Sequence, residues 1–309
     1  MFRLFTPLFA AFDTIISSYA TTVSSRVMVA ITPVLNAALV LWVIGWGILI
    51  MAGAMHQPLR EFIQRFVRNA VVLSFAIGAG YYQGTVAELV RTVPDDLATV
   101  VMGDEAARFY ALGDPSRPAL DSADTGSAQG ALIDRAAGQG LSAAMDALEK
   151  GGIFKEEGIV FLVYGILLLL STVALVAAGG AIIIVAKVVL GVLVALGPIF
   201  IASLLFDATR RFFERWVAMV VTYGLLIVLF ALLFTFVLGI FGHYMDQVRL
   251  DGSVNAVYAI AGALVLSVVS ILVLREAKVL AMGLSGGLAL PALGRGWSQR
   301  IVRAVRGGE

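Results

Sequence analysis

The side chains that could catalyse a reaction are few in this sequence and lie far apart. His56 and His243 are the only histidines, and neither belongs to a metal-binding pattern such as His-Glu-x-x-His. Glu156 and Glu157 are neighbouring carboxylates, but they come directly before a long apolar run and are typical of the outer edge of a membrane segment. We therefore predict no catalytic residues and no enzymatic activity.

Residues that would hold a cofactor are missing as well. The chain has no cysteine, which excludes disulfides, iron–sulfur clusters and a cysteine nucleophile. None of the four lysines, Lys150, Lys155, Lys187 and Lys278, completes the glycine-rich loop that binds nucleotide phosphates. We predict neither a cofactor nor a metal site.

The composition is typical of a chain that lies in the lipid bilayer. Of the 309 residues, 60% are hydrophobic and 14% are charged, and the mean hydropathy is +0.94. Soluble domains carry about a quarter charged residues, so the sequence predicts an all-α, polytopic helical membrane protein. The net charge of +1 says little about partners, and the placement of the charges along the chain is more informative.

A single lysine and a cluster of arginines lie at informative places. Lys187 is the only basic residue of the apolar run 158–206, and its side chain either extends to the membrane interface or has a role in a pore or in packing. Arg210, Arg211 and Arg215 form a basic cluster within residues 207–216. Because short basic loops stay in the cytoplasm, this cluster is predicted to set the topology of the chain.

The sequence divides into five parts, of which the first is an amphipathic N-terminal segment. Its apolar residues recur at helical spacing with Asp13 and Ser17 between them, which predicts a helix that lies in the membrane interface or packs on the rest of the protein. In order, the parts are this segment (1–33), two early transmembrane helices (34–90), a polar, acidic periplasmic insert (91–157), a C-terminal transmembrane bundle (158–284) and a basic cytoplasmic tail (285–309).

The first two spans are expected at residues 34–54 and 69–90, which suit a hydrocarbon core about 30 Å thick. Between them, Arg60, Arg65 and Arg68 face a single acid, which favours a cytoplasmic loop.

Small residues and prolines give further signals. Gly80 and Gly84 have the Gly-x-x-x-Gly spacing that allows close helix packing, although Gly is also frequent by chance in membrane helices. Residues 88–157 hold thirteen acids against six bases. Within them, Asp95 and Asp96 follow Pro94, a pattern that predicts the start of a helix.

The apolar run 158–206 is too long for one straight span, since 49 helical residues would extend about 73 Å. A helix break or re-entrant turn is expected at Gly179–Gly180 or at Gly197–Pro198. One crossing plus a turn satisfies every charge and gives five transmembrane helices, with the N-terminus outside and the C-terminus inside. Two crossings give six helices, and inversion of the whole chain is a third arrangement that the sequence leaves open.

One stretch carries a resemblance to a known family. Residues 197–226 read GPIFIASLLFDATRRFFERWVAMVVTYGLL, in which an apolar run, an Arg-Arg-Phe-Phe cluster and Trp216 follow one another. This pattern resembles the TrbL-like family of polytopic inner-membrane subunits of bacterial type IV secretion systems. The resemblance is specific over about residues 192–226 and extends to the general layout of the rest.

The resemblance implies a channel or scaffold subunit in the bacterial inner membrane that supports pilus assembly and the translocation of DNA or protein. It implies a homo-oligomeric ring, a pentamer, at the base of the periplasmic stalk, with the minor pilin, other inner-membrane subunits and the secretion ATPases as partners. Trp216 would then be an assembly or interface anchor, together with Phe212 and Phe213. The arginines favour contact with the lipid bilayer over transient contact with translocated DNA or protein. A polytopic solute permease is the alternative function.

Overall fold

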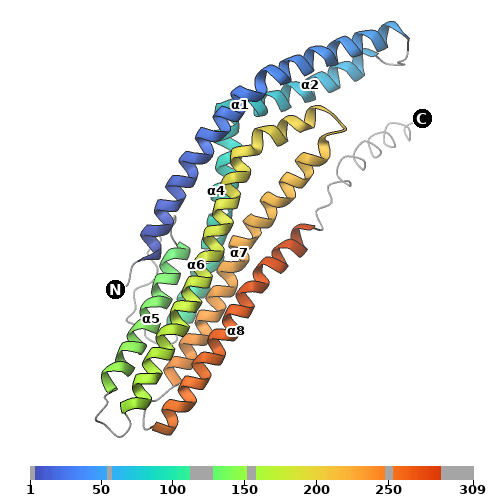
Figure 1. Cartoon of the computed structure of the whole chain (residues 1–309). Coiled ribbons are helices and arrows are strands. Elements are labelled where there is room, and N and C mark those ends of the chain that lie inside the picture. The colour runs from blue at the N-terminus through green and yellow to red at the C-terminus, as the bar shows by residue number, and fades with distance from the viewer. Residues whose placement is uncertain (1–3, 54–57, 112–127, 152–157, 248–252, 287–309) are drawn as a thin grey trace, which may run out of the picture. The chain divides into compact units, whose positions relative to one another are not determined.

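A computed structural model describes residues 4–53, 58–111, 128–151, 158–247 and 253–286 of the chain. Every regular element in these ranges is helical, which confirms the all-α prediction. His56, Glu156 and Glu157 lie outside the described residues, as does most of the predicted basic tail. The elements, labelled as in Figure 1, are α1 (Phe5–Met51), α2 (Pro58–Ile77), α3 (Ala79–Tyr81), the π-helical turn η1 (Tyr82–Ala87), α4 (Glu88–Ala111), α5 (Ala128–Lys150), α6 (Gly158–Ala202), the 3-10 turn η3 (Ser203–Leu205), α7 (Arg210–Gln247) and α8 (Ser253–Gly286).

Helix α1 joins two segments that the sequence presents as separate elements. The amphipathic segment and the first span form one helix of 47 residues, with Pro33 inside it. Its length of about 70 Å is more than twice the thickness of a hydrocarbon core. The boundary expected at residue 33 is therefore not a break in the helix.

The second predicted span is bent. Residues Phe62–Ile77 and Tyr82–Val101 meet at an angle of 75° around Gly78. A Cβ atom at Gly78 would collide with the carbonyl oxygen of Ser74, so the backbone at the bend leaves no room for a side chain. The chain thus turns here, and not at the two places where the sequence suggested a turn.

Helix α6 runs through both of those places without interruption. It contains Gly179, Gly180, Gly197 and Pro198 in one helix of 45 residues, so the predicted breaks are wrong. The glycines serve close packing instead. A Cβ atom at Gly180 would lie 2.7 Å from the ring of Phe5, and one at Gly179 would lie 3.2 Å from two aromatic rings of α7.

Three described helices are long and apolar enough to cross a membrane, namely Phe5–Met51, Gly158–Leu205 and Arg210–Val237. The bent pair around Gly78 brings the number to four if it counts as one span. This count concerns only the part of the chain that the structure describes. Residues 256–274, the last apolar stretch of the predicted C-terminal bundle, are helical throughout as part of α8.

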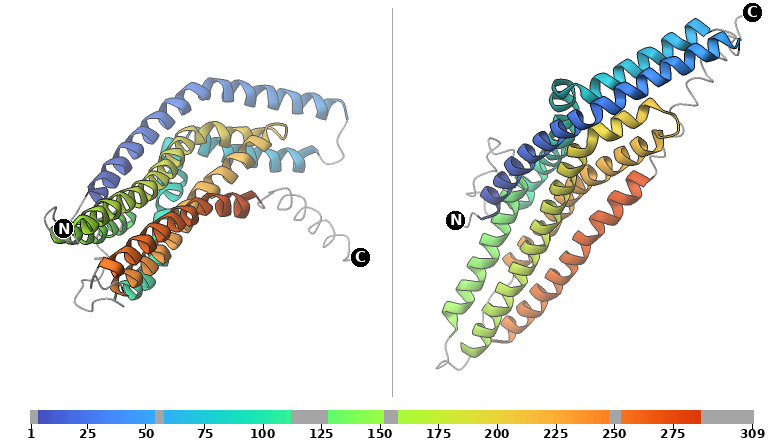
Figure 2. Two further views of the ribbon diagram at one scale, coloured as in Figure 1. Left: turned by 60° about the horizontal axis from the view of Figure 1, so that its bottom comes forward. Right: turned by 45° about the horizontal axis from the view of Figure 1, so that its top comes forward.

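The chain forms two compact units, each built from three separate stretches. The first unit comprises Met1–Tyr19, Leu89–Gly191 and Tyr223–Ala281. In it, α5 and the corresponding parts of α6, α7 and α8 run side by side (Figures 1 and 2). Gly140 of α5 lies directly against the side chain of Thr172 in α6, so these two helices approach closely.

The second unit comprises Ala20–Glu88, Val192–Thr222 and Met282–Glu309. Within it, α2 runs beside the second half of α1 (Figure 2), and Phe62 contacts both Trp42 and Trp46 with ring centroids 5.8 and 6.1 Å apart. Gly80 and Gly84 have no neighbouring atom within 4 Å of an added Cβ, so the predicted close packing does not occur within the described chain. Packing between copies at these glycines stays a prediction.

Candidate functional site

The first turn of α1 is bound by a carboxylate from α5 in the first unit. The backbone N–H groups of Leu4, Phe5 and Thr6 donate to Asp134 at 2.7–2.8 Å, and the hydroxyl of Thr6 donates to it at 2.7 Å. N–H groups in the first turn of a helix have no partner within their own helix, and the positive end of the helix dipole attracts an anion. Asp134 therefore acts as a cap for a helix more than a hundred residues away in the sequence.

These contacts change the acidity of Asp134. Burial raises the pKa of its carboxyl, but the hydrogen bonds from Phe5, Thr6 and Leu4 together lower it more, so the pKa lies below its ordinary value of 3.8. The carboxylate is thus stabilised in its charged form by the N–H groups that it caps.

Lys187 lies at the centre of a charge network in the first unit. Its side chain is only 7% exposed, and its Nζ atom donates to both carboxylate oxygens of Asp13 at 2.9–3.0 Å and to Asp95 at 2.9 Å. The network joins α1, α4 and α6. Removing such charges from water has a large cost, which close contacts with two carboxylates offset.

The position of Asp95 differs from the expectation drawn from Pro94. Helix α4 begins at Glu88 and continues through Pro94, so Asp95 does not start a helix, and the prediction is wrong. Its carboxylate instead lies one helical turn after Arg91, whose guanidinium donates to the hydroxyl of Ser17 on α1. Because Asp13 and Ser17 are also one turn apart, the facing stripes of α1 and α4 are both polar.

The orientation of the start of α1 follows from these contacts. Asp13 and Ser17 face other helices of the first unit, whereas Ile15 and Tyr19 are 64% and 56% exposed. A helix on a water-exposed surface would show the opposite arrangement. Of the two alternatives for this segment, the contacts fit a helix that packs on the rest of the protein.

Pro198 is the centre of a second set of contacts, in the second unit. A residue with an N–H group at this position would donate to the carbonyl of Val194, four residues earlier, but proline has none. The hydroxyl of Tyr82 donates to this carbonyl instead. Gly197 makes the contact possible, because a Cβ atom there would collide with the Tyr82 hydroxyl.

Trp216 binds the neighbouring carbonyl. Its indole Nε1 donates to the carbonyl oxygen of Leu193 at 2.9 Å, and its ring lies against Phe200 and Phe213 with centroids 6.1 and 5.7 Å apart. Trp216 is only 4% exposed and packs inside its own chain, whereas Phe212 is 54% exposed. Whether these residues also anchor an assembly stays a prediction.

The basic cluster forms contacts at the surface of the second unit. Arg210 pairs with Glu214 at 3.2 Å, and Arg68 of α2 reaches Asp207 at 3.5 Å. Arg65 lies over the ring of Trp46, 5.3 Å from its centroid. The contact between Arg68 and Asp207 brings the basic stretch of the first loop next to residues 207–216. No sequence pattern indicates this neighbourhood.

Residues 283–287 read Gly-Leu-Ser-Gly-Gly, the spacing of the nucleophile turn in serine hydrolases, which follows a strand. Here Ser285 lies within α8, where its hydroxyl accepts a hydrogen bond from the hydroxyl of Thr222 and donates one to the carbonyl of Met282. Its surroundings are therefore those of a helix contact. Among the described residues, no group of three or more acidic or histidine side chains could hold a metal ion.

Comparison with known proteins decides the family. The model of the "TrbL/VirB6 plasmid conjugal transfer protein" family matches residues 39–277, more than three quarters of the chain. The chain belongs to the TrbL/VirB6 family.

Curated relatives of this TrbL/VirB6 chain carry consistent names. It is 25% identical over 247 residues to the type IV secretion system protein VirB6 of Brucella abortus, which covers 78% of this chain and 66% of the relative, just under two thirds of its length. It is 27% identical over 235 residues to protein VirB6 of Agrobacterium fabrum, covering 76% of this chain and 72% of the relative. The type IV secretion system protein VirB6 of Bartonella quintana is 23% identical over 282 residues, 91% of this chain and 77% of the relative.

In this TrbL/VirB6 chain the sequence identified Lys187, Pro198 and Trp216 as notable residues but not their partners. Asp13 is the only acid in the first sixty residues, and Lys187 is the only base of its apolar run. A lone acid in one apolar segment and a lone base in another were thus a signal for their pairing. Nothing in the sequence pattern singled out Tyr82 or Asp134.

Proposed function

We propose that this chain is an inner-membrane scaffold and channel subunit of a type IV secretion system. Membership of the TrbL/VirB6 family carries the proposal, and the relatives are named as type IV secretion system proteins. Long apolar helices agree with a multi-pass membrane protein of such a system. No enzymatic role is proposed, because the buried polar groups that stand out in the described structure bind other groups of the same chain.

The finer proposal is a ring of five copies at the base of the periplasmic stalk, in contact with the minor pilin, the other inner-membrane subunits and the secretion ATPases. Each copy crosses the membrane five times, with the insert at 91–157 in the periplasm. The single helix α6 supports one crossing between the insert and residues 207–216. The contact between Arg68 and Asp207 supports a common side for the first loop and the basic cluster.

The test is a deletion of the gene in a host that carries the complete secretion system, followed by complementation with the intact chain. We expect the deletion to abolish transfer of DNA to recipient cells or of protein to target cells, and the intact chain to restore it. The purified chain in detergent should have the mass of five copies. Unchanged transfer in the deletion strain, together with a monomeric mass, would refute the proposal.

A further inference from the structure

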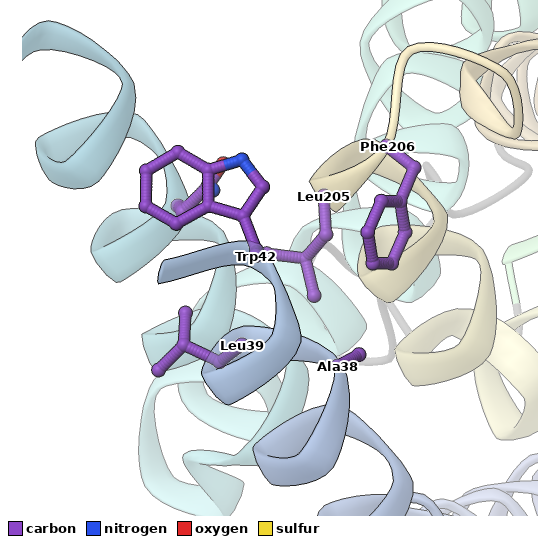
Figure 3. A pocket seen from close by; sticks show the side chains of 6 residues that line it. Ala38, Leu39, Trp42, Leu205 and Phe206 are labelled. Atoms are coloured by element: carbon purple, nitrogen blue, oxygen red, sulfur yellow. The ribbon is translucent and has the colours of Figure 1, made fainter. Parts of the chain in front are cut away.

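The hollow between α1, α2 and the segment after α6 in the second unit is too small to bind a partner molecule. Figure 3 shows its walls, to which α1 contributes Ala38, Leu39 and Trp42, and the segment after α6 contributes Leu205 and Phe206. The space between them admits about one water molecule. Surfaces that could bind a partner therefore lie on the outer faces of the helices, and α6 carries one of them.

A strip of five apolar side chains follows the outer face of the first half of α6. Successive members are four, three, four and three residues apart, which is the spacing of a seam along which two helices pack. Each of these side chains is at least 44% exposed in the single chain. We call them the α6 strip: Ile159, Val163, Ile166, Leu170 and Val173.

The length of α6 places part of this helix outside the lipid. Its 45 residues extend about 67 Å, whereas a hydrocarbon core is about 30 Å thick. Helix tilts of up to about 40° do not remove this difference. The C-terminal end of α6 comes shortly before the basic cluster, which the proposed topology places on the cytoplasmic side. The half that begins at Gly158 and carries the α6 strip therefore extends beyond the core on the periplasmic side.

The charged face of α5 lies at the same level of the first unit as the α6 strip. Gly140 of α5 lies against Thr172 of α6. Directly after α5, Gly151 lies against Leu162, so the second half of α5 accompanies the part of α6 that carries the strip. Because exposed charges are costly in lipid, this level of the first unit is in water. The exposed charged residues of this half of α5 are Asp146, Glu149 and Lys150.

The α6 strip is thus an apolar surface in water, which another protein surface must cover. In the proposed ring, the neighbour of each copy is another copy of the same chain. Contact between two identical surfaces joins two copies and stops there, whereas a closed ring of more copies joins two different surfaces. The surface that covers the α6 strip therefore lies on another helix.

Helix α8 exposes a matching strip in the same unit. Its members are three and four residues apart and are 54–63% exposed. Figure 1 shows α7 between α6 and α8 in this unit, so the two strips belong to helices that are not neighbours within one copy. Each copy can thus contact one neighbour through α6 and the other through α8. We call these residues the α8 strip: Val265, Val268 and Leu272.

We propose that the α6 strip of one copy packs on the α8 strip of the next copy in the ring. Both strips are apolar, both have the spacing of a helix–helix seam, and both are left exposed by the single chain. This inference rests on the proposed ring and names the two surfaces that build it.

Cysteine cross-linking tests the contact, because the natural chain has no cysteine. Leu170→Cys is combined with Val265→Cys, Val268→Cys or Leu272→Cys in the full chain, and the membranes are oxidised. At least one pair should give a ladder of linked copies on a non-reducing gel, whereas Leu170→Cys alone should give none. Asp146→Cys, on the charged face of α5, is combined with the same α8 variants as the control and should give no ladder.

Two double variants measure what the α6 strip contributes to association. Ile166→Ala with Leu170→Ala should weaken self-association of the purified chain at least about tenfold, because it removes apolar surface from the contact. Val185→Ala with Val188→Ala changes exposed residues in the other half of α6, which the proposed topology places in lipid, and should leave association unchanged. The midpoint of unfolding shows that both variants are folded.

The outcomes separate this contact from the ring itself. If the wild type has the mass of five copies but none of the three pairs forms a ladder, or if the strip variant keeps its full association, lipid or another surface covers the strip and the proposed contact is overturned. A monomeric wild type would instead refute the proposed ring.

Discussion

The ammonium of Lys187 reaches two carboxylates, on Asp13 and Asp95, which are 174 and 92 residues away in the sequence. A lone lysine within an apolar helix would have to be neutralised or extend to water. The two acids remove this need, because they match its charge within the protein. The network therefore fixes which faces of α1, α4 and α6 meet.

Replacing Lys187 by Met should lower the free energy of unfolding by about 3 kcal/mol, because two neighbouring carboxylates then lose their counter-charge. The triple variant with Asp13→Asn and Asp95→Asn should recover most of this loss. Chemical unfolding in detergent micelles measures both effects. Lys278→Met, at an exposed position of α8, serves as the control. A loss in the triple variant equal to that in Lys187→Met would contradict this account.

Trp216 and Trp42 provide a matched comparison, since both are stacked on aromatic rings but only Trp216 is buried. Trp216→Ala should cost about 3–5 kcal/mol of unfolding free energy, because it leaves a cavity and removes the hydrogen bond from the indole to the carbonyl of Leu193. Trp42→Ala should cost clearly less. The same pair measured in a transfer assay tests whether Trp216 also matters for assembly. Equal and negligible effects on stability and transfer would refute its role as an anchor.

At the scale of helices, Pro198 shows how α6 can continue through a residue that lacks an N–H group. The carbonyl that proline leaves unpaired accepts the hydroxyl of Tyr82, and Gly197 provides the space for it. Sequence reasoning treated Gly197–Pro198 as a break because it considered only the helix itself. In a membrane protein, neighbouring helices can satisfy the freed group, and here η1 does so.

Tyr82→Phe should lower the free energy of unfolding by about 1–3 kcal/mol, since the buried carbonyl of Val194 loses its donor. In the background of Pro198→Ala, the restored N–H group can donate to the same carbonyl, and Tyr82→Phe should then cost much less. The double-mutant cycle gives this difference directly. Tyr81→Phe, at an exposed neighbouring position, is the control. Identical costs in both backgrounds would show that Tyr82 does not replace the missing amide.

The contact between α1 and α5 should make the stability of the protein depend on pH. The pKa of Asp134 is lowered in the folded protein, so its stabilising effect is present at neutral pH and disappears as the pH falls through the folded pKa, below about 3.9. Asp134→Asn should therefore reduce the free energy of unfolding at pH 7 but hardly at pH 2. Asp146→Asn, which removes the same charge at an exposed position of the same helix, is the control. A constant difference between wild type and Asp134→Asn across this range would exclude the effect.

The sequence predicted which residues are helical better than it predicted where a helix bends or continues. Apolar composition and spacing indicated the helices, because these depend on neighbouring residues. The uninterrupted passage of α6 through Gly179–Gly180 depends on what lies opposite these glycines, namely Phe5 and the rings of α7. Such contacts join distant segments and leave no periodic pattern in the chain. For the same reason, the sequence did not indicate the partners of Lys187 or the cap on α1.

At the scale of the whole molecule, the contact between Arg68 and Asp207 limits the number of crossings. Two residues that touch at the surface lie on the same side of a membrane, so an even number of crossings separates them. One crossing by the bent segment around Gly78 and one by α6 meet this condition. The proposed topology, which adds the first span and two spans after residue 216, meets the same condition with five crossings.

Topology reporters test this count. A reporter that is active only in the periplasm should give a signal when it is inserted at Leu120 or Leu250 and none at Phe212 or Arg300. The physical reason is the retention of basic loops in the cytoplasm. A fluorescent protein that matures only in the cytoplasm is the reciprocal control. A periplasmic signal at Phe212 would rule out five crossings.

The charge network has a consequence for how the protein is made. Asp13 and Asp95 leave the ribosome 174 and 92 residues ahead of Lys187, so both acids enter the translocon before their base exists. Until α6 is synthesised, each carboxylate must stay protonated or near water, because an unpaired charge in lipid is costly. The arrival of Lys187 then makes burial of both acids favourable. Assembly of the first unit is therefore tied to the order of translation.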